Sequence, residues 1–181
     1  MRAKVALTSG LVALLAAMPL AGCGEEEGEE ALQAVEGEPL HLDELIYNVA
    51  ITRFLNPNET SDAEYLEGQP AEPQGQSYLG VFLLIKNDNE DEAVASADDY
   101  IVSDAGDRHY ELLESESPYA LEVGATVEPD GTIPEADTTA AAGPIQGAML
   151  LYLVDDDVSE ERPLELEIES AGATGVVELD I

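Results

Sequence analysis

Cysteine and tryptophan are nearly missing from this chain of 181 residues, which contains one cysteine, Cys23, and no tryptophan. One cysteine cannot form a disulfide within the chain, so an exported domain has to be held by its apolar core alone. The region 38–181 is long enough to bury such a core as a single domain. We expect tyrosine and phenylalanine to supply the aromatic packing.

Basic residues are also scarce, because 40 Asp and Glu stand against six Lys and Arg and give a formal charge of −34 at pH 7. Binding to a phosphate backbone depends on clustered Lys and Arg, so the composition excludes a nucleic-acid partner. Adsorption to anionic lipid headgroups is disfavoured for the same reason. A surface this acidic keeps proteins soluble but repels itself, and we therefore expect added salt to raise the melting temperature.

The first residues have the three parts of a secretory signal: a cationic start with Arg2 and Lys4, an apolar run over 5–19, and small residues before Cys23. The apolar run is shorter than the ~20 residues that a membrane-spanning helix needs. The sequence Leu20-Ala21-Gly22-Cys23 resembles the lipobox of bacterial lipoproteins. This resemblance implies cleavage before Cys23 and a diacylglyceryl thioether on its sulfur, with palmitate as a typical acyl chain. It places the protein on the extracytoplasmic face of a cell membrane, or on an outer membrane if the cell has one.

Three regions are therefore expected: a signal peptide over 1–22, a flexible acidic tether over 23–37, and a domain over 38–181. Residues 24–30 consist of five Glu and two Gly, a composition that repels itself and cannot bury a core.

Strand patterns dominate the domain. Alternation with a period of two predicts strands with one buried face in three segments: 45–52, 164–169 and 177–181. Two runs that are apolar on both parities predict central strands covered on both faces: 78–85 and 148–154. Shorter strands separated by Asp and Gly turns are expected at 93–97, 100–103 and 109–113. Many short strands without a helical stripe predict an all-β fold, an antiparallel sandwich.

Four segments in this order, Leu42–Val49, Tyr78–Asn87, Tyr100–Tyr110 and Gly143–Tyr152, resemble a large group of bacterial lipoproteins. These share a domain of unknown function with an immunoglobulin-like sandwich. The shared pattern is a first strand, a strand ending in Lys-Asn, a strand leading to a turn with Asp and Gly, and a Gly-rich approach to an apolar strand. The resemblance covers most of 40–170 and implies an extracytoplasmic, immunoglobulin-like β-sandwich without a catalytic residue.

Residues for catalysis are few. His41 and His109 lie beside predicted strand starts, without a Gly-x-Ser-x-Gly elbow or a free cysteine. Two histidines are also too few for a structural zinc site, which takes four ligands. Carboxylates are abundant, but nothing marks one pair as the opposed acid and base of a glycosidase. We expect no enzyme; a hydrolase of envelope polysaccharide stays as an alternative.

Calcium is the other alternative, because two acidic turns follow predicted strands and carry the oxygen ligands that Ca²⁺ prefers. The first turn contains Asp88, Asn89, Glu90 and Asp91, and the second contains Asp155, Asp156 and Asp157. Neither has the spacing of an EF-hand loop, since Ala93 stands where the turn glycine would be. Exposed polar turns would have the same composition, so no cofactor is required.

Two long connections, 56–76 and 114–146, are the expected place of recognition, because loops on a rigid scaffold commonly carry it. Their apolar residues are candidate partner contacts: Tyr65, Leu66, Tyr119 and Leu121. Alternatively, these side chains fold back onto the sandwich. The expected function is that of a membrane-anchored, non-catalytic interaction or accessory module with an envelope protein partner, and a calcium- or solute-binding module is the alternative.

Overall fold

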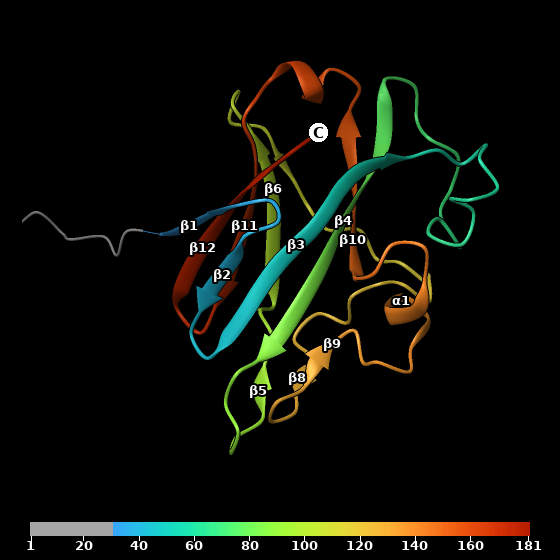
Figure 1. Cartoon of the computed structure of the whole chain (residues 1–181). Coiled ribbons are helices and arrows are strands. Elements are labelled where there is room, and N and C mark those ends of the chain that lie inside the picture. The colour runs from blue at the N-terminus through green and yellow to red at the C-terminus, as the bar shows by residue number, and fades with distance from the viewer. Residues whose placement is uncertain (1–30) are drawn as a thin grey trace, which may run out of the picture.

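The computed structural model describes residues 31–181, and two β-sheets pack face to face in it (Figure 1). Sheet A contains, in spatial order, β1 (Leu32–Val35), β12 (Ala173–Leu179), β11 (Leu164–Ser170), β6 (Asp99–Asp104) and β7 (His109–Tyr110). Sheet B contains β10 (Ala148–Asp155), β4 (Gln76–Asn87), β3 (Leu45–Leu55) and β2 (Pro39–Leu42), with β9 (Thr132–Ile133) beside β4. The remaining elements are the pair β5 (Val94–Ala95) and β8 (Thr126–Val127), the helix α1 (Thr139–Ala142) and the 3₁₀ turn η1 (Val158–Glu160). The prediction of an all-β, antiparallel sandwich is confirmed.

Strand burial follows the sequence pattern that predicted it. Leu164, Leu166 and Ile168 of β11 are fully buried, while the glutamates between them stay partly exposed on the opposite face. β4 is different, because residues of both parities are buried along most of its length. One face of β4 packs against sheet A, and the other is covered by the two long connections, so the prediction of a doubly covered central strand is confirmed.

Three tyrosines fill the space between the sheets in place of tryptophan. Tyr47, Tyr100 and Tyr152 are each at most 1% exposed. The Tyr47 hydroxyl accepts a hydrogen bond from the Ala97 N–H at 2.8 Å, and the Tyr152 hydroxyl donates to the Tyr100 carbonyl at 3.3 Å. Burial raises the pKa of all three hydroxyls, so they remain protonated and can act as donors within the core.

The predicted tether extends too far into the chain. Within 23–37, β1 pairs in parallel with β12, from Leu32 opposite Gly175 to Val35 opposite Glu178. The Glu36 carboxylate then accepts hydrogen bonds from the N–H groups of Thr52 and Asp180, both at 3.1 Å. The sandwich therefore begins at β1 rather than at residue 38, because this glutamate satisfies backbone donors on both sheets instead of extending into solvent.

Candidate functional site

Three of the four predicted partner contacts lie in a buried group on the outer face of sheet B, which we call the aromatic cluster. Tyr65, Leu66 and Tyr119 are 2%, 8% and 4% exposed. The Tyr65 ring meets Phe82 of β4 edge to face, at 5.2 Å between centroids and 81° between planes, and lies 4.5 Å from the Tyr119 ring. These side chains therefore fold back onto the apolar outer face of β4, which is the alternative that the sequence left open, and a partner contact by them stays a prediction.

Polar contacts hold the first connection over this cluster. Asp62, 2% exposed, accepts hydrogen bonds from the Arg53 guanidinium at 2.5 Å and from the Asn56 N–H at 2.9 Å. The Tyr119 hydroxyl donates to Glu64 at 3.1 Å and so ties the second connection to the first. Gly143 leaves room for the Tyr119 ring, since a Cβ at this position would lie 2.6 Å from the ring carbon Cε1.

The two acidic turns lie at opposite ends of sheet B. The first follows Asn87 at the end of β4, whereas the second begins at Asp155, which is paired with Gln76 at the start of β4. Eleven residue steps of strand, roughly 36 Å at about 3.3 Å each, separate these ends. The two turns therefore do not form one site, as Figure 1 shows for the ends of β4.

In each turn several side-chain oxygen atoms already have protein partners. Asn89 accepts hydrogen bonds from the N–H groups of Asp91 and Glu92, and Asp88 forms an ion pair with Lys86. In the second turn all three aspartates are engaged: Asp155 and Asp157 with Arg108, and Asp156 with Ser77. Across residues 31–181 no group of three or more His, Cys, Asp or Glu is placed to hold a metal ion. Calcium binding stays a prediction.

Arg108 is the centre of a polar network that the sequence did not predict. Its guanidinium contacts Asp104 at 2.6 Å, Asp155 at 3.0 Å and Asp157 at 2.8 Å. The Asp104 side chain is fully buried and also accepts a hydrogen bond from the Tyr110 hydroxyl at 3.1 Å. Burial alone would raise the pKa of Asp104, but hydrogen bonds from the Arg108 backbone and side chain and from Tyr110 outweigh it and hold the pKa below its ordinary value. Burial and the same Asp104 raise the pKa of Tyr110 to about 12.

This network joins the two sheets. Asp104 and Tyr110 belong to β6 and β7 of sheet A, whereas Asp155 ends β10 of sheet B. Its arrangement is that of a structural clamp.

The two histidines are separated by the fold. His41 lies on β2 of sheet B and His109 lies on β7 of sheet A, and both are exposed.

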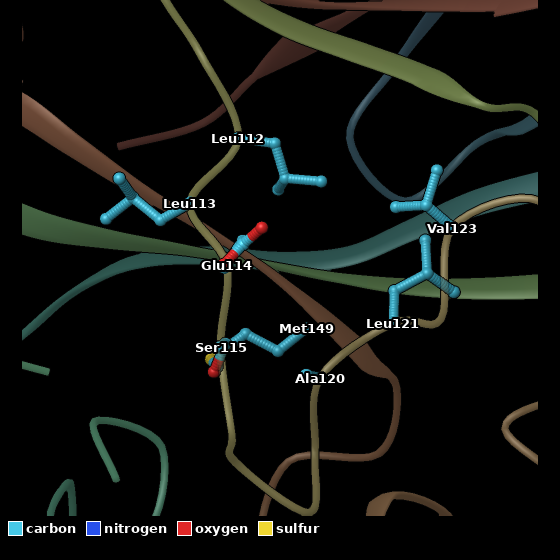
Figure 2. A pocket seen from close by; sticks show the side chains of 8 residues that line it. All are labelled: Leu112, Leu113, Glu114, Ser115, Ala120, Leu121, Val123 and Met149. Carbon is cyan, nitrogen blue, oxygen red and sulfur yellow. The ribbon is translucent and has the colours of Figure 1, made fainter. Parts of the chain in front are cut away.

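An apolar groove lies beside the edge of β10, with a volume of about 280 Å³ (Figure 2). One wall is 112–115, the other is 120–123, and Met149 of β10 forms the floor. Figure 2 shows Leu112 pointing into the space between the walls, toward Leu121 and Val123 on the other side. Val123 is 38% exposed and stands at the opening, whereas Leu121, the fourth predicted contact, is 8% exposed in the wall.

Backbone hydrogen bonds to β10 fix both walls. The Leu113 N–H donates to the Leu151 carbonyl at 2.8 Å, and the Leu121 N–H donates to the Met149 carbonyl at 2.9 Å. The Met149 N–H in turn donates to the Tyr119 carbonyl at 2.7 Å. The walls are the two arms of one loop, whose turn carries Tyr119 of the aromatic cluster, so the packing of that cluster also positions the groove.

The loop that forms the groove is acidic. Glu114 lines it, and Glu111, Glu116 and Glu122 are exposed on the same loop. Residues 111–123 contain no Lys, Arg or His. The groove thus combines an apolar interior with the Glu114 carboxylate in its lining, on a loop that carries three further exposed glutamates.

No family model matches the sequence, and no curated protein matches it. Solved structures do share its fold. An uncharacterized β-sandwich protein of Clostridium difficile 630 superposes with a TM-score of 0.51 at 14% identity, over 86% of this chain and 99% of that one. The yjhA protein of Bacillus subtilis superposes with a TM-score of 0.54 at 13% identity, over 81% and 99% of the two chains. At these identities the similarity establishes the β-sandwich fold.

A third structure, that of the candidate lipoprotein ycdA of Bacillus subtilis, has a TM-score of 0.48 at 15% identity, over 79% of this chain and 38% of that one. This weaker similarity adds nothing to the fold assignment. Cys23, the predicted lipidation site, lies outside the described residues. Within residues 31–181 there is no helix of the length and apolarity needed to cross a bilayer.

Proposed function

We propose that the protein is a lipid-anchored, non-catalytic module of the cell envelope that binds a protein partner through the groove between 112–115 and 120–123. The anchor rests on Cys23, the lone cysteine, which directly follows a segment with the composition of a lipoprotein signal. Acyl chains supply the membrane attachment, since a chain this acidic is repelled by anionic headgroups.

The observation that carries the binding role is the groove itself. It is an apolar hollow whose walls are fixed by backbone hydrogen bonds to β10. A preformed site loses little conformational entropy on binding, and recognition by loops on a rigid sandwich is common.

Two experiments in the natural host test the two parts of this proposal separately. Metabolic labelling with an alkyne-bearing palmitate analogue is expected to mark the wild-type protein, and Cys23→Ser is expected to lose the label and remain uncleaved. A wild-type protein without label would overturn the anchor.

For the binding role, a photo-cross-linking amino acid is placed at Val123 on the groove or at Val35 on β1 of sheet A, a valine of similar exposure away from the groove. We expect a discrete cross-linked product from position 123 and none from position 35. Equal products from both positions, or none from position 123, would contradict a role for the groove.

A further inference from the structure

We infer that the groove binds an extended peptide segment of its partner in which an aliphatic side chain is flanked by lysine or arginine. This inference rests on the proposed binding role and adds the chemistry of the partner. The size of the groove, the open backbone of one wall and the charge around it support the inference.

The size of the groove fits side chains of a peptide. Its volume of about 280 Å³ lies just below the ~300–1,000 Å³ range of small-molecule sites. The interior surfaces come from Leu112, Leu121, Val123 and Met149, and the hollow lacks a buried charged group that would orient a polar ligand. An aliphatic side chain entering this space would therefore exchange water for apolar contact on both walls and the floor.

The backbone of the first wall is partly open to a neighbouring extended chain. Residues 111–116 belong to no strand, and the Leu113 N–H is engaged with β10. Within 31–181, Leu112 makes no backbone–backbone hydrogen bond, whereas the Glu114 carbonyl accepts a hydrogen bond from the Gln69 side chain at 2.7 Å. An extended peptide lying along this wall would supply partners to the Leu112 backbone groups, as in other cases of added-strand recognition, and would place alternate side chains into the groove.

The negative charge of the groove loop favours an extended peptide that is basic. Glu114 lines the groove and three further glutamates are exposed on its loop, without a base between residues 111 and 123. Arg53, Lys86 and Arg108 are already paired with aspartates. A second copy of this chain would carry the same negative charge to the interface, whereas Lys or Arg beside the apolar anchor would meet the glutamates of the loop and speed association.

The test uses the purified mature protein in a mild nonionic detergent and three fluorescent peptides, compared by anisotropy. The first has Leu-Val-Leu flanked by alternating Gly and Lys, the second has Ser in place of Leu and Val, and the third has Glu in place of Lys. We expect the first peptide to bind, and the second and third to bind at least tenfold more weakly. Raising NaCl to about 0.5 M is expected to weaken the first peptide by severalfold, because the glutamates of the loop are exposed.

Protein variants locate the binding. Val123→Asp is expected to weaken the first peptide at least tenfold, whereas the matched control Val35→Asp changes it less than twofold. Glu114→Lys is expected to weaken it severalfold at low salt, with Glu90→Lys in the exposed first acidic turn as its control. The urea midpoint of each variant is measured first, so that a change in binding is compared among folded proteins.

Several outcomes would overturn the inference. Equal affinity for the Leu-containing and Ser-containing peptides would mean that Lys adsorbs to a generally acidic surface. Equal loss from Val123→Asp and Val35→Asp would place the binding elsewhere, and tighter binding of the Glu peptide would reverse the charge argument. A partner cross-linked at position 123 whose contacting segment lacks Lys and Arg would refute the basic peptide while leaving the proposed function standing.

Discussion

Replacing Tyr65 by alanine tests whether the first long connection is packed against the sandwich. The ring is 2% exposed and touches Phe82 and Tyr119. Burial of an aromatic side chain contributes about 1.5–3 kcal/mol, and each well-oriented aromatic pair adds about 0.5–1.5 kcal/mol. Truncation of a buried aromatic residue to alanine typically costs about 3–5 kcal/mol. We expect Tyr65→Ala to lower the free energy of unfolding by about 3–4 kcal/mol, and the melting temperature by roughly 10 °C.

Tyr65→Phe is the matched control. The Tyr65 hydroxyl is buried and has no hydrogen-bond partner within the described residues. Removing this oxygen keeps the ring contacts and relieves an unsatisfied polar group, so the free energy of unfolding should stay within about 1 kcal/mol of wild type or rise.

Equilibrium unfolding in urea, followed by circular dichroism, measures both variants. Limited proteolysis adds a local reading, because loss of the ring should expose 56–75 to cleavage in Tyr65→Ala first. A loss below about 1 kcal/mol for Tyr65→Ala, equal to that of Tyr65→Phe, would refute the packing argument. Tyr65 would then be free to contact a partner, as the sequence alone had suggested.

Three further changes test the network, the end of β4 and the acidic surface. Arg108→Leu removes the cation that helps to lower the pKa of Asp104. The ionised carboxylate stabilises the fold above its ordinary pKa of 3.8, and this stabilisation is lost as the pH falls through the lowered value. The acid-unfolding midpoint, followed by circular dichroism, should therefore move to higher pH in the variant. An unchanged midpoint would contradict the role of Arg108. Asn87→Ala should lower the free energy of unfolding, measured in urea, by about 2–3 kcal/mol, because the buried amide donates to the carbonyls of Glu92 and Val127. A loss within experimental error would mean that water takes the place of the amide. Raising NaCl to about 1 M, where the Debye length is ~3 Å, should raise the melting temperature measured by calorimetry, and a flat response would argue against self-repulsion as a term in stability.

The strands that the sequence predicted are those whose pattern reports burial directly. β11 alternates because only one of its faces packs against sheet B. β4 is apolar on both parities because sheet A covers one face and the long connections cover the other. The β1 strand was missed because Leu32–Val35 follows a run of glutamates and its outer side chains remain exposed. Its place is set by pairing with β12, about 140 residues further along, and no local pattern carries that information.

The site was less predictable than the fold, since it depends on which segments meet. The apolar residues in the long loops were found, but the sequence did not reveal that Tyr65 and Tyr119 would face β4 while Val123 would face solvent. The Arg108 network brings together carboxylates separated by about fifty residues, at the end where both sheets meet. Only the scarcity of basic residues could have drawn attention to Arg108. With 40 acidic residues in the chain, the sequence does not show which carboxylates pair with a given Lys or Arg.

The parallel pairing of β1 with β12 determines how the domain bears mechanical load. A pull on the N-terminal segment enters the sandwich at Leu32 and acts along the axis of β1. Force along paired strands loads the four register positions from Leu32 to Val35 together, in shear, rather than opening them one after another. The Glu36 carboxylate, bonded to Thr52 and Asp180, adds a second attachment behind the strand. With the proposed lipid anchor at Cys23, tension would therefore reach the domain first at an end that is held twice.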